Sequence, residues 1–452
     1  MSVYKHRTSR TSSKLSAGHG CFSRLLKFYC MYAHSYRMKG SEMPEPVYVL
    51  GGTQTDFAVN WTKEDEQPLT SMLREAVAGA LIDARIEPEE IQTAHVGNFG
   101  AEQFTGQSHL GALVPMLYPA WHGLPTSRHE AACASGSMAL LAATAEIEAG
   151  RYDIALVAGV ELMRNIRGDQ AARHLGSAAM VPEETASDDL PWPSLFNRIA
   201  EETDQRHGLD QRYLDRIAEI NRTNARRNPK AQTRDWTLEP EQFTADDIVN
   251  PIVTGRTRKS DCGRITDGAA AVVLAGRRFA DEWARGQRGA PRSRVLGWGH
   301  HTAPLPLRSK FLPSKPDDYL FPHVRDAIFD AYRRANLQGP RDLDVIETHD
   351  CFTITEYMAL EHFGLTGPGD AWQAIENGLI DFEGPLPVNP SGGLIGAGHP
   401  VGATGVRMLL DAHRQVTGTA GGYQVEAARK AGTLNIGGSA STAVSFMIGA
   451  AD

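Results

Sequence analysis

Apolar residues along this chain fall into short runs separated by longer stretches that favour helices. The runs are rich in Val, Ile, Leu and Ala and are bounded by glycine or polar residues, as is typical of buried strands. We expect strands at 47–53, 94–98, 153–160, 266–275, 343–347, 432–438 and 442–448. We expect helices at about 68–83, 139–149, 322–336, 354–363 and 404–416. Strands that alternate with helices in this way predict an α/β fold.

The pattern occurs twice along the chain. Residues 45–278 and 279–452 each offer a strand, a polar loop, a helix and a further strand, so we predict two duplicated halves. The alternation stops between about 163 and 255, where charged residues, tryptophans and loop residues replace it. We interpret this segment as a lobe inserted into the first half. A chain of 452 residues is long enough for two or three domains.

Candidate chemistry is found beside these elements. Cys133 lies among Ala, Ser and Gly residues just before the helix expected at 139–149. The free N–H groups and positive dipole of a helix start stabilise a thiolate. The stretch fits an activated nucleophile and a structural cysteine equally well. His349 follows the strand at 343–347, and His399 lies in a glycine-rich loop that runs into a helix. Open α/β sheets place their sites at such positions.

Composition and charge exclude several classes of protein. The net charge is −8 and all acidic residues lie after residue 41, so the body is acidic and is not expected to bind nucleic acid. Five cysteines without regular spacing argue against a disulfide framework. The absence of a CxxC motif or a His/Cys cluster with zinc spacing leads us to expect no metal. No run is long enough for a membrane span.

The first 44 residues form a basic extension that we expect to be disordered. Residues 1–41 contain eight Lys or Arg and many Ser, which resembles a mitochondrial transit peptide. Their apolar residues are clustered rather than spaced along one helical face, so the alternative is a translation start at Met38 or Met43. The second interpretation predicts a cytoplasmic protein, and the first a mitochondrial one.

Five motifs in a fixed order resemble one family, the thiolases. They are HEAACASGSMALL, SDCGRITDGAAAVVL, HDCF, NPSGGLIGAGHPVGATG and LNIGGSASTAV. The match runs from about residue 47 to the C-terminus and is strongest for the branch related to the thiolase part of sterol carrier protein X. It implies an α/β thiolase fold of two βαβαβαββ halves with an inserted loop domain. It also implies a homodimer or tetramer that uses coenzyme A and acyl-CoA as substrates, with no permanently bound cofactor and no metal.

The resemblance assigns roles to the polar residues singled out above. Cys133 would be the nucleophile, and His399 the base that takes its proton. His349 would hold the thioester oxygen of the substrate. The structural alternatives are that His399 caps a glycine turn and that His349 is bonded to Asp350.

The sequence departs from the family at two positions. Asn435 stands where most thiolases carry a second catalytic cysteine, and Cys351 in the HDCF motif can supply the missing thiol. Gly437 would keep its role, pairing its N–H with that of Cys133 to form an oxyanion hole. Gly263 stands where the family often has a serine that contacts coenzyme A. The remaining cysteines are interpreted as non-catalytic: Cys21, Cys30 and Cys262.

A basic cluster follows in the inserted segment and comprises Arg222, Arg226, Arg227 and Lys230. Such a cluster usually marks a solvated helix face. In the thiolase interpretation, Arg222 and Arg226 would instead lie near the 3′-phosphate of coenzyme A, since Arg suits phosphate recognition.

Three other functions stay open at this stage. A thiolase-like protein can be a non-catalytic acyl-CoA binder in a complex with a small OB-fold partner, and Asn435 and Gly263 favour this reading. A lyase that cleaves a steroid side chain by a retro-aldol reaction is a related possibility. Ketoacyl synthesis on acyl carrier protein also uses a Cys/His/His set, but the GHP loop and the HDCF motif fit it less well.

Overall fold

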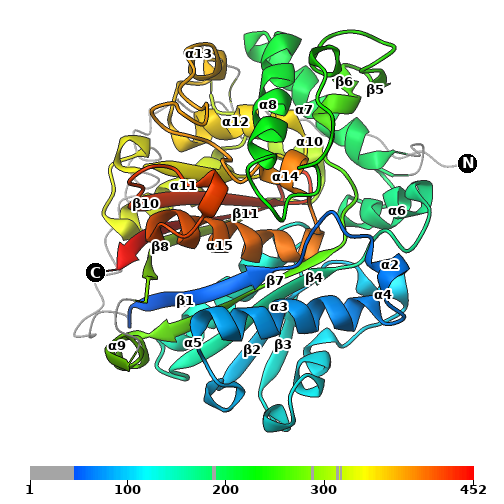
Figure 1. The fold of residues 1–452 in the computed structure, drawn as a ribbon. Helices are drawn as coiled ribbons and strands as arrows, with labels where there is room; N and C mark the ends of the chain where they lie inside the picture. Colours follow the sequence, from blue (N-terminus) through cyan, green and yellow to red (C-terminus); the bar gives the residue numbers. More distant parts are fainter. Residues whose placement is uncertain (1–44, 186–189, 287–289, 312–314, 316–317, 452) are drawn as a thin grey trace, which may run out of the picture. The chain divides into compact units, whose positions relative to one another are not determined.

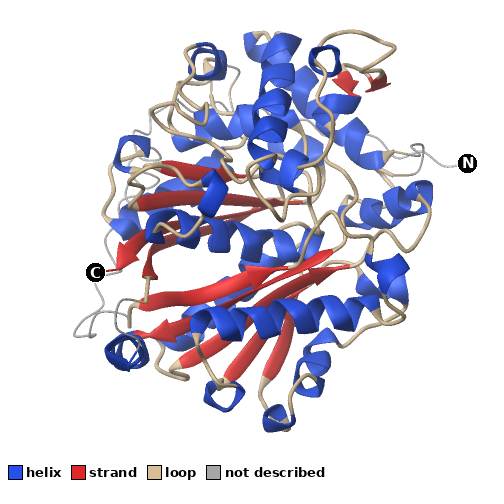
Figure 2. Ribbon diagram, viewed as in Figure 1, coloured by secondary structure: helices blue, strands red, loops and turns tan. Residues whose placement is uncertain are grey.

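A mixed sheet of nine strands organises the part of the chain that the computed structural model describes, residues 45–185, 190–286, 290–311, 315 and 318–451. The strand order is β3-β2-β4-β7-β1-β8-β11-β10-β9 (Figures 1 and 2). The bounds are β1 Val47–Gln54, β2 Thr93–Gly97, β3 Thr126–His129, β4 Ile154–Glu161, β7 Gly268–Gly276, β8 Arg292–Thr302, β9 Val345–Thr348, β10 Lys430–Gly437 and β11 Thr442–Ala451. The predicted extension, residues 1–44, lies outside the described residues.

The sheet consists of two similar halves joined at a narrow contact. The first half has the order β3-β2-β4-β7-β1, and the second half continues from it as β8-β11-β10-β9. Strands β8, β11, β10 and β9 thus correspond to β1, β7, β4 and β2 in mirrored order. The counterpart of β3 is reduced to one parallel bridge between Val388 and Ile346. Within the sheet, the two halves pair through β1 and β8, at Tyr48 with Arg294 and Val49 with Ser293. This arrangement confirms the predicted duplication.

Helices cover the strands of both halves on each face. They are α3 Pro68–Ala84, α5 Ser135–Glu148, α11 Pro322–Ala335, α12 Thr353–Phe363 and α15 Thr404–Thr417. Helix α3 packs on β1 and β7, and α11 packs on β8 and β11. Helix α15 packs beside α5 and contacts strands of both halves, and Figure 1 shows it between the two groups of strands. Successive residues of β4 therefore enter different cores, Leu156 on the α3 side and Val157 on the α5 side.

The two central helices approach each other closely at their first turns. A Cβ on Gly159 of β4 would lie 2.3 Å from the carbonyl oxygen of Gly402, and one on Gly136 of α5 would lie 2.8 Å from the same atom. Glycine is needed at both positions because real Cβ contacts are not this short. The loops that carry Cys133 and His399 are thereby brought together.

The chain leaves the sheet between β4 and β7. This segment contains α6 Gly168–Leu175, α7 Pro191–His207, α8 Gln211–Ala225 and the hairpin β5 Ile252–Thr254 with β6 Thr257–Arg258. Among the described residues, no helix combines the length and the apolar character that crossing a membrane requires. The sequence did not predict β3 or β8. Strand β3 has four half-buried residues, three of them polar and one an arginine, so it lacks the apolar run that marks a buried strand.

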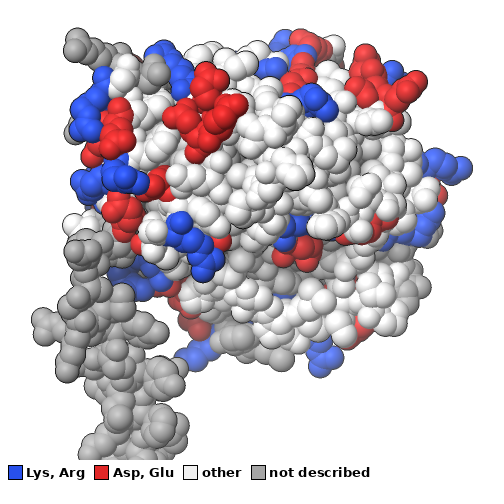
Figure 3. Space-filling model, turned by 90° about the horizontal axis from the view of Figure 1, so that it is seen from below, with Lys and Arg blue, Asp and Glu red and all other residues white. Residues whose placement is uncertain are grey.

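Strand β3 forms one edge of the sheet. Residues 103–127, which end with the first two residues of this strand, contain no Lys, Arg, Asp or Glu. The face of the described part seen in Figure 3 has a broad area without charged side chains. An uncharged surface next to an unpaired strand edge is suited to contact with another protein chain.

Candidate active site

Cys133 lies on a tight turn between β3 and α5. The preceding residue, Ala132, has φ +51°, which is uncommon for a residue other than glycine. The turn is closed by backbone bonds from Ala134 N–H to Ala131 O, 3.0 Å, and from Ser135 N–H to Ala132 O, 3.1 Å. The nucleophile is thus placed just before the first residue of α5, as the sequence predicts. A strained residue beside a reactive side chain is a common feature of functional sites.

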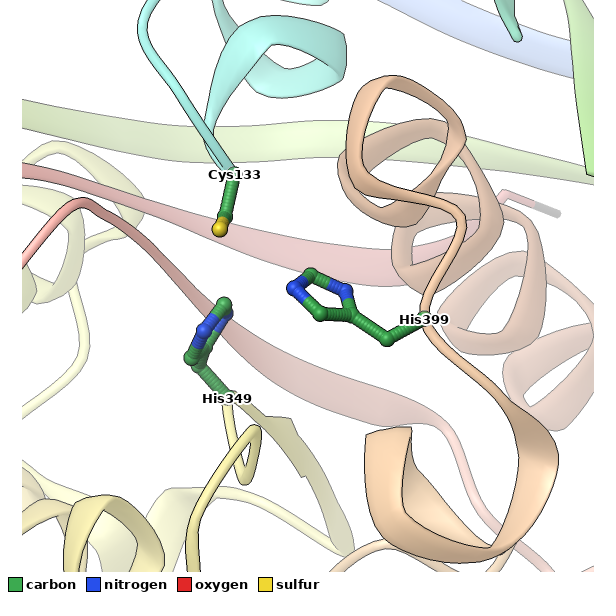
Figure 4. Close-up of side chains that lie close together, drawn as sticks. All are labelled: Cys133, His349 and His399. Atoms are coloured by element: carbon green, nitrogen blue, oxygen red, sulfur yellow. The ribbon is translucent and has the colours of Figure 1, made fainter. Parts of the chain in front are cut away.

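Two histidines converge on this cysteine. His349 directly follows β9, and His399 lies in the loop between α14, Gly393–Ala397, and α15. A side-chain nitrogen of each histidine and the Cys133 sulfur all lie within 4.8 Å of one another. The two rings are nearly perpendicular, at 89°, with centroids 5.3 Å apart. Figure 4 shows both rings turned toward the sulfur.

The hydrogen bonds of His399 determine which nitrogen carries its proton. Nδ1 lies 2.7 Å from the hydroxyl oxygen of Thr404, and that hydroxyl donates to the carbonyl oxygen of Pro400 at 2.8 Å. The Thr404 oxygen therefore accepts a bond from Nδ1–H of His399. Nε2 is left with a lone pair and can accept a proton. The backbone N–H of His399 donates to the hydroxyl of Thr266 at 2.9 Å, which fixes the loop.

His349 has the opposite tautomer. Its Nδ1 accepts a bond from the backbone N–H of Ile436 at 3.4 Å and from Nδ2 of Asn435 at 3.2 Å. A backbone N–H can only donate, so the proton of the neutral ring is on Nε2. That Nε2–H is buried and has no partner. The ring therefore presents a free hydrogen-bond donor to the site.

The alternative of a His349–Asp350 pair does not match these contacts. Asp350 accepts bonds from the backbone N–H groups of Leu394, 2.5 Å, and Ile395, 3.1 Å, and from the side chain of Asn221 at 2.9 Å. Asp350 thereby joins the HDCF loop to the glycine-rich loop and to α8.

Burial keeps the reactive groups uncharged. It lowers the pKa of His399 to about 3, with a smaller effect from the charge of Arg407. It also holds the pKa of His349 well below its usual range, helped by His399. Burial raises the pKa of Cys133 to about 12, although the backbone N–H of Gly438 acts in the opposite direction. The expected stabilisation of a thiolate is therefore outweighed, and the resting group is a thiol beside a neutral base.

The remaining predicted residues surround the same sulfur. Cys351 is buried and lines the same cavity as Cys133, as does Cys262, whose thiol donates to Arg258 O at 3.4 Å. Gly437 ends β10, where a Cβ would lie 2.1 Å from the carbonyl oxygen of Ala131, so glycine is required there. The backbone N–H of the next residue, Gly438, lowers the pKa of the Cys133 sulfur, whereas the predicted role of Gly437 in an oxyanion hole stays a prediction. Cys21 and Cys30 lie outside the described residues.

An apolar cavity of about 250 Å³ opens at the sulfur. Cys133, Cys351, His399 and Gly438 form its polar end. Its wall is largely apolar and includes Met163, Leu175, Leu190, Trp192, Phe196 and Phe352. Phe196 of α7 stacks on Phe352 with ring centroids 4.3 Å apart, so the inserted segment supplies one side of the cavity. These lining residues come from separate segments of the chain, so no periodic pattern in the sequence predicts the cavity wall.

A second cavity of about 460 Å³ is basic rather than apolar. Its lining includes Arg222, Trp236, Lys259 and Arg264, and Arg264 also lines the apolar cavity. Burial lowers the pKa of Arg222 to about 10, with a contribution from Arg264. The Nε atoms of Arg222 and Arg264 are both buried without a hydrogen-bond partner.

The predicted basic cluster is not one site. Arg222 faces the basic cavity, whereas Arg226 is exposed at the end of α8 and is not among the residues lining that cavity. Arg227 stacks on Phe382 with its guanidinium 4.0 Å from the ring centroid. Lys230 lines a different cavity. Arg226 and Arg227, four and five positions after Arg222, lie beyond the last helical residue, Ala225, and are therefore directed elsewhere.

The Cys133, His349 and His399 set is close enough to hold a metal ion, and no other group in the described ranges was found to be. A metal would require the lone pair of His349 Nε2. That atom carries the proton, because Nδ1 accepts the Ile436 N–H. The donor set therefore fits a metal poorly.

Comparisons with known proteins agree with this architecture. Residues 47–278 match the family model for the thiolase N-terminal domain, and residues 310–450 match that for a thiolase C-terminal domain-like region. An acetyl-CoA acetyltransferase of Methanothermobacter thermautotrophicus is 33% identical over 88% of this chain and 97% of its own length. Sterol carrier protein 2 of Gallus gallus is 27% identical over 87% of this chain and 70% of its own length.

Solved structures give the same fold at lower sequence identity. The chain described as an Ltp2-ChsH2(DUF35) aldolase superimposes with a TM-score of 0.72 at 20% identity, covering 90% of this chain and 99% of that one. Human mitochondrial 3-ketoacyl-CoA thiolase superimposes with a TM-score of 0.65 at 17% identity, covering 91% and 100%. Two family models that together span most of the chain, with a relative at 33% identity, show that this protein belongs to the thiolase family.

Proposed function

We propose that this protein cleaves 3-ketoacyl-CoA with a second molecule of coenzyme A, or catalyses the reverse condensation, through an acyl-enzyme on Cys133. The observation that carries the proposal is the pair of histidines in opposite tautomers beside one thiol. His399 offers a lone pair and His349 offers an N–H. One site therefore holds a nucleophile, a base and an oxyanion donor.

In the first half-reaction, Nε2 of His399 takes the Cys133 thiol proton and the sulfur attacks the keto carbon. The N–H groups of Cys133 and Gly437 hold the resulting oxyanion. The bond between C2 and C3 then breaks and leaves the enolate of acetyl-CoA, whose thioester oxygen accepts the Nε2–H of His349. Cys351 donates its proton to C2. Burial raises the pKa of Cys351 well above its usual value, so it starts as a thiol and can act as this acid.

In the second half-reaction, a new coenzyme A thiol gives its proton to the Cys351 thiolate. Its sulfur attacks the thioester carbonyl of the acyl-enzyme. The tetrahedral intermediate collapses, the acyl chain leaves on coenzyme A, and Cys133 recovers its proton from His399. The first half-reaction ends with Cys351 as a thiolate and His399 protonated, and the second returns every group to its starting protonation state.

The two cavities suit the two ends of an acyl-CoA. The apolar cavity next to Cys133 would take the acyl chain, and the basic cavity around Arg222, Lys259 and Arg264 would take the phosphate-bearing end. Arg264 lines both, so one elongated substrate can reach from one to the other. Burying an arginine Nε without a protein partner is costly, and a ligand phosphate would satisfy it. Arg226 is not part of this proposal.

The active protein is proposed to be a homodimer or a tetramer. The support is the open edge of β3 and the uncharged stretch at 103–127, which runs into the first two residues of this strand. Pairing two copies along β3 would remove an unpaired strand edge from solvent. Because β3 leads directly to Cys133, such a contact would also hold the nucleophile turn in place.

The test is the intact mass of the protein after mixing with a short 3-ketoacyl-CoA in the absence of free coenzyme A. An acyl adduct that maps to Cys133, with one acetyl-CoA released per site, is the expected result. Cys133→Ala should form no adduct. Cys351→Ala should still be acylated by a simple acyl-CoA but should not cleave the carbon–carbon bond. An adduct on another residue, or cleavage by Cys133→Ala, would overturn the scheme.

A second candidate is a thiolase-like lyase or a non-catalytic acyl-CoA-binding subunit that works with an OB-fold partner. It is favoured by the superposition on the Ltp2-ChsH2(DUF35) aldolase and by Asn435 in place of a cysteine. This candidate predicts no adduct on Cys133 with any 3-ketoacyl-CoA, together with measurable coenzyme A binding.

A further inference from the structure

Asn435 lies at the centre of a buried chain of hydrogen bonds that links the two halves. Its Oδ1 accepts a bond from the hydroxyl of Ser137 at 2.8 Å, and its Nδ2 donates to Nδ1 of His349 at 3.2 Å. Ser137 is in the first turn of α5, Asn435 is on β10, and His349 follows β9. All three side chains are almost inaccessible to solvent, with exposed fractions of 2%, 1% and 0%. The contacts are therefore not exchanged for water.

This chain fixes the direction of the Asn435 amide. With its oxygen bonded to Ser137, the amide can present only its NH₂ group to His349. An NH₂ group requires a lone pair on Nδ1, and so it requires the ring proton on Nε2. Nε2 is the atom that has no partner and faces the site. The backbone N–H of Ile436 acts on Nδ1 in the same sense but at a longer distance, 3.4 Å.

We propose that Asn435 is a positioning residue that holds His349 in the tautomer whose Nε2–H donates into the active site. This inference rests on the proposed function, in which that N–H stabilises the enolate oxygen. An asparagine cannot exchange protons at neutral pH, so it controls the reaction by choosing where the proton of its neighbour is. Ser137, from the other half of the fold, donates to the amide oxygen and supports the direction that the obligate donor Ile436 N–H requires.

The decisive variant is Asn435→Asp, which has nearly the same shape but only acceptor oxygens. An ionised carboxylate next to Nδ1 draws the ring proton to that nitrogen, because a bond to a charged acceptor is stronger than the bond from Ile436 N–H. Nε2 then loses its donor. We expect kcat for carbon–carbon cleavage to fall by roughly ten- to a hundredfold. Activity should partly return at lower pH, where the imidazolium again carries an Nε2–H.

The comparison variant is Asn435→Ala, which leaves a gap and only the longer Ile436 bond on Nδ1, so the tautomer is held less firmly than in the wild type but is not reversed. If Asn435 only fills space, the alanine variant is the worse enzyme, since aspartate fits the same volume. If Asn435 controls the tautomer, the aspartate variant is the worse enzyme. Ser137→Ala should lie between the aspartate variant and the wild type, because the amide becomes free to turn over.

The tautomer itself can be read without turnover, by proton–nitrogen correlation NMR on protein with ¹⁵N-labelled histidine, using His349→Asn to assign the signal. The expected result is an Nε2–H form in the wild type and an Nδ1–H form in Asn435→Asp. An Nδ1–H form in the wild type, or the same form in both, overturns the inference. An inactive wild type with the expected tautomers would overturn the proposed function alone. If Asn435→Asp does not fold, the wild-type spectrum and Ser137→Ala give the answer.

Discussion

The ends of β2 and β9 occupy equivalent places in the two halves, and they differ in how completely their polar groups are bonded. Asn98 follows β2 and is fully buried. Its NH₂ donates to Val160 O at 2.8 Å and to Glu161 at 2.9 Å, and its oxygen accepts from Ala101 N–H at 3.2 Å. His349 follows β9 and is equally buried, but its Nε2–H has no partner. The polar side chain after β2 is thus fully hydrogen-bonded, whereas the one after β9 keeps a hydrogen-bond donor without a partner.

The difference indicates where this duplicated scaffold does its chemistry. Leaving a buried donor without a partner costs on the order of 1–3 kcal/mol, so it persists where another molecule supplies the partner. The same feature occurs in the basic cavity, where Arg222 Nε and Arg264 Nε are unpartnered. Unpartnered buried atoms also occur elsewhere, for instance Nε and Nη2 of Arg407, whose Nη1 bonds to Glu347 and Asp411. Incomplete bonding is therefore a feature of both proposed binding regions but is not confined to them.

The largest effect is expected for His399→Ala, which removes the proposed base from the site beside Cys133. The kcat for cleavage should fall by roughly 10²- to 10⁴-fold, because no other lone pair faces the Cys133 thiol. Thr404→Val should cost much less, since it frees the ring without removing it. Steady-state rates for both variants, with a 3-ketoacyl-CoA and coenzyme A, give the comparison. Equal losses in the two variants would contradict a base role for His399.

The next effect contrasts the two strand ends directly. His349→Ala should lower kcat by roughly 10²- to 10³-fold with a small change in stability, because it removes an oxyanion donor. His349→Asn, which can present an NH₂ group, should recover part of the loss. Asn98→Ala should instead lower the free energy of unfolding by about 1–3 kcal/mol, because it removes the bonds to Val160 O and Glu161 and takes the acceptor from Ala101 N–H. Steady-state rates measure the change in kcat, and urea unfolding curves measure the change in stability. A large loss of stability in His349→Ala, or a large loss of kcat without loss of stability in Asn98→Ala, would contradict the contrast between the two strand ends.

The third prediction concerns the pH dependence of Cys133. A thiol with a pKa of about 12 is almost fully protonated at neutral pH. As long as the pH stays below that pKa, each increase of one pH unit raises the ionised fraction about tenfold. Alkylation of Cys133 by iodoacetamide should therefore accelerate continuously from about pH 6 to about pH 10. Mapping the modified residue by mass spectrometry checks this. A plateau near neutral pH would mean that Cys133 and His399 form an ion pair in the resting enzyme.

The smallest effect separates two arginines at the end of α8. Arg222→Met should raise the KM for coenzyme A by roughly tenfold, because it removes the guanidinium whose unpartnered Nε would bind the phosphate in the basic cavity. Arg226→Met should leave KM unchanged, since Arg226 is exposed and outside that cavity. Dephospho-coenzyme A, which lacks the 3′-phosphate, should bind the two proteins alike if Arg222 contacts that group. A higher KM for coenzyme A in Arg226→Met would instead support the sequence-based prediction that Arg222 and Arg226 both bind the 3′-phosphate.

Much of the fold was predictable from the sequence, for local physical reasons. The strands β1, β4 and β7 are continuous apolar runs buried on both faces, and such runs carry their own signal. The same holds for the position of Cys133 before α5 and of His399 before α15, since small residues followed by helix formers define a helix start. Strand β3 was missed because it is short, half-buried and polar, so only its neighbours make it a strand.

The sequence by itself determined the duplicated α/β order and the family, and it singled out Cys133, His349 and His399, which the structure brings together. Only the tertiary structure decided how those side chains are protonated and which backbone N–H meets the sulfur. Whether His349 donates or accepts depends on Ile436 and Asn435, which are more than 80 positions away in the chain. The pKa of Cys133 depends on burial, which no local stretch contains. Residue type fixes what a group can do, but its partners come from distant segments, and these select one state.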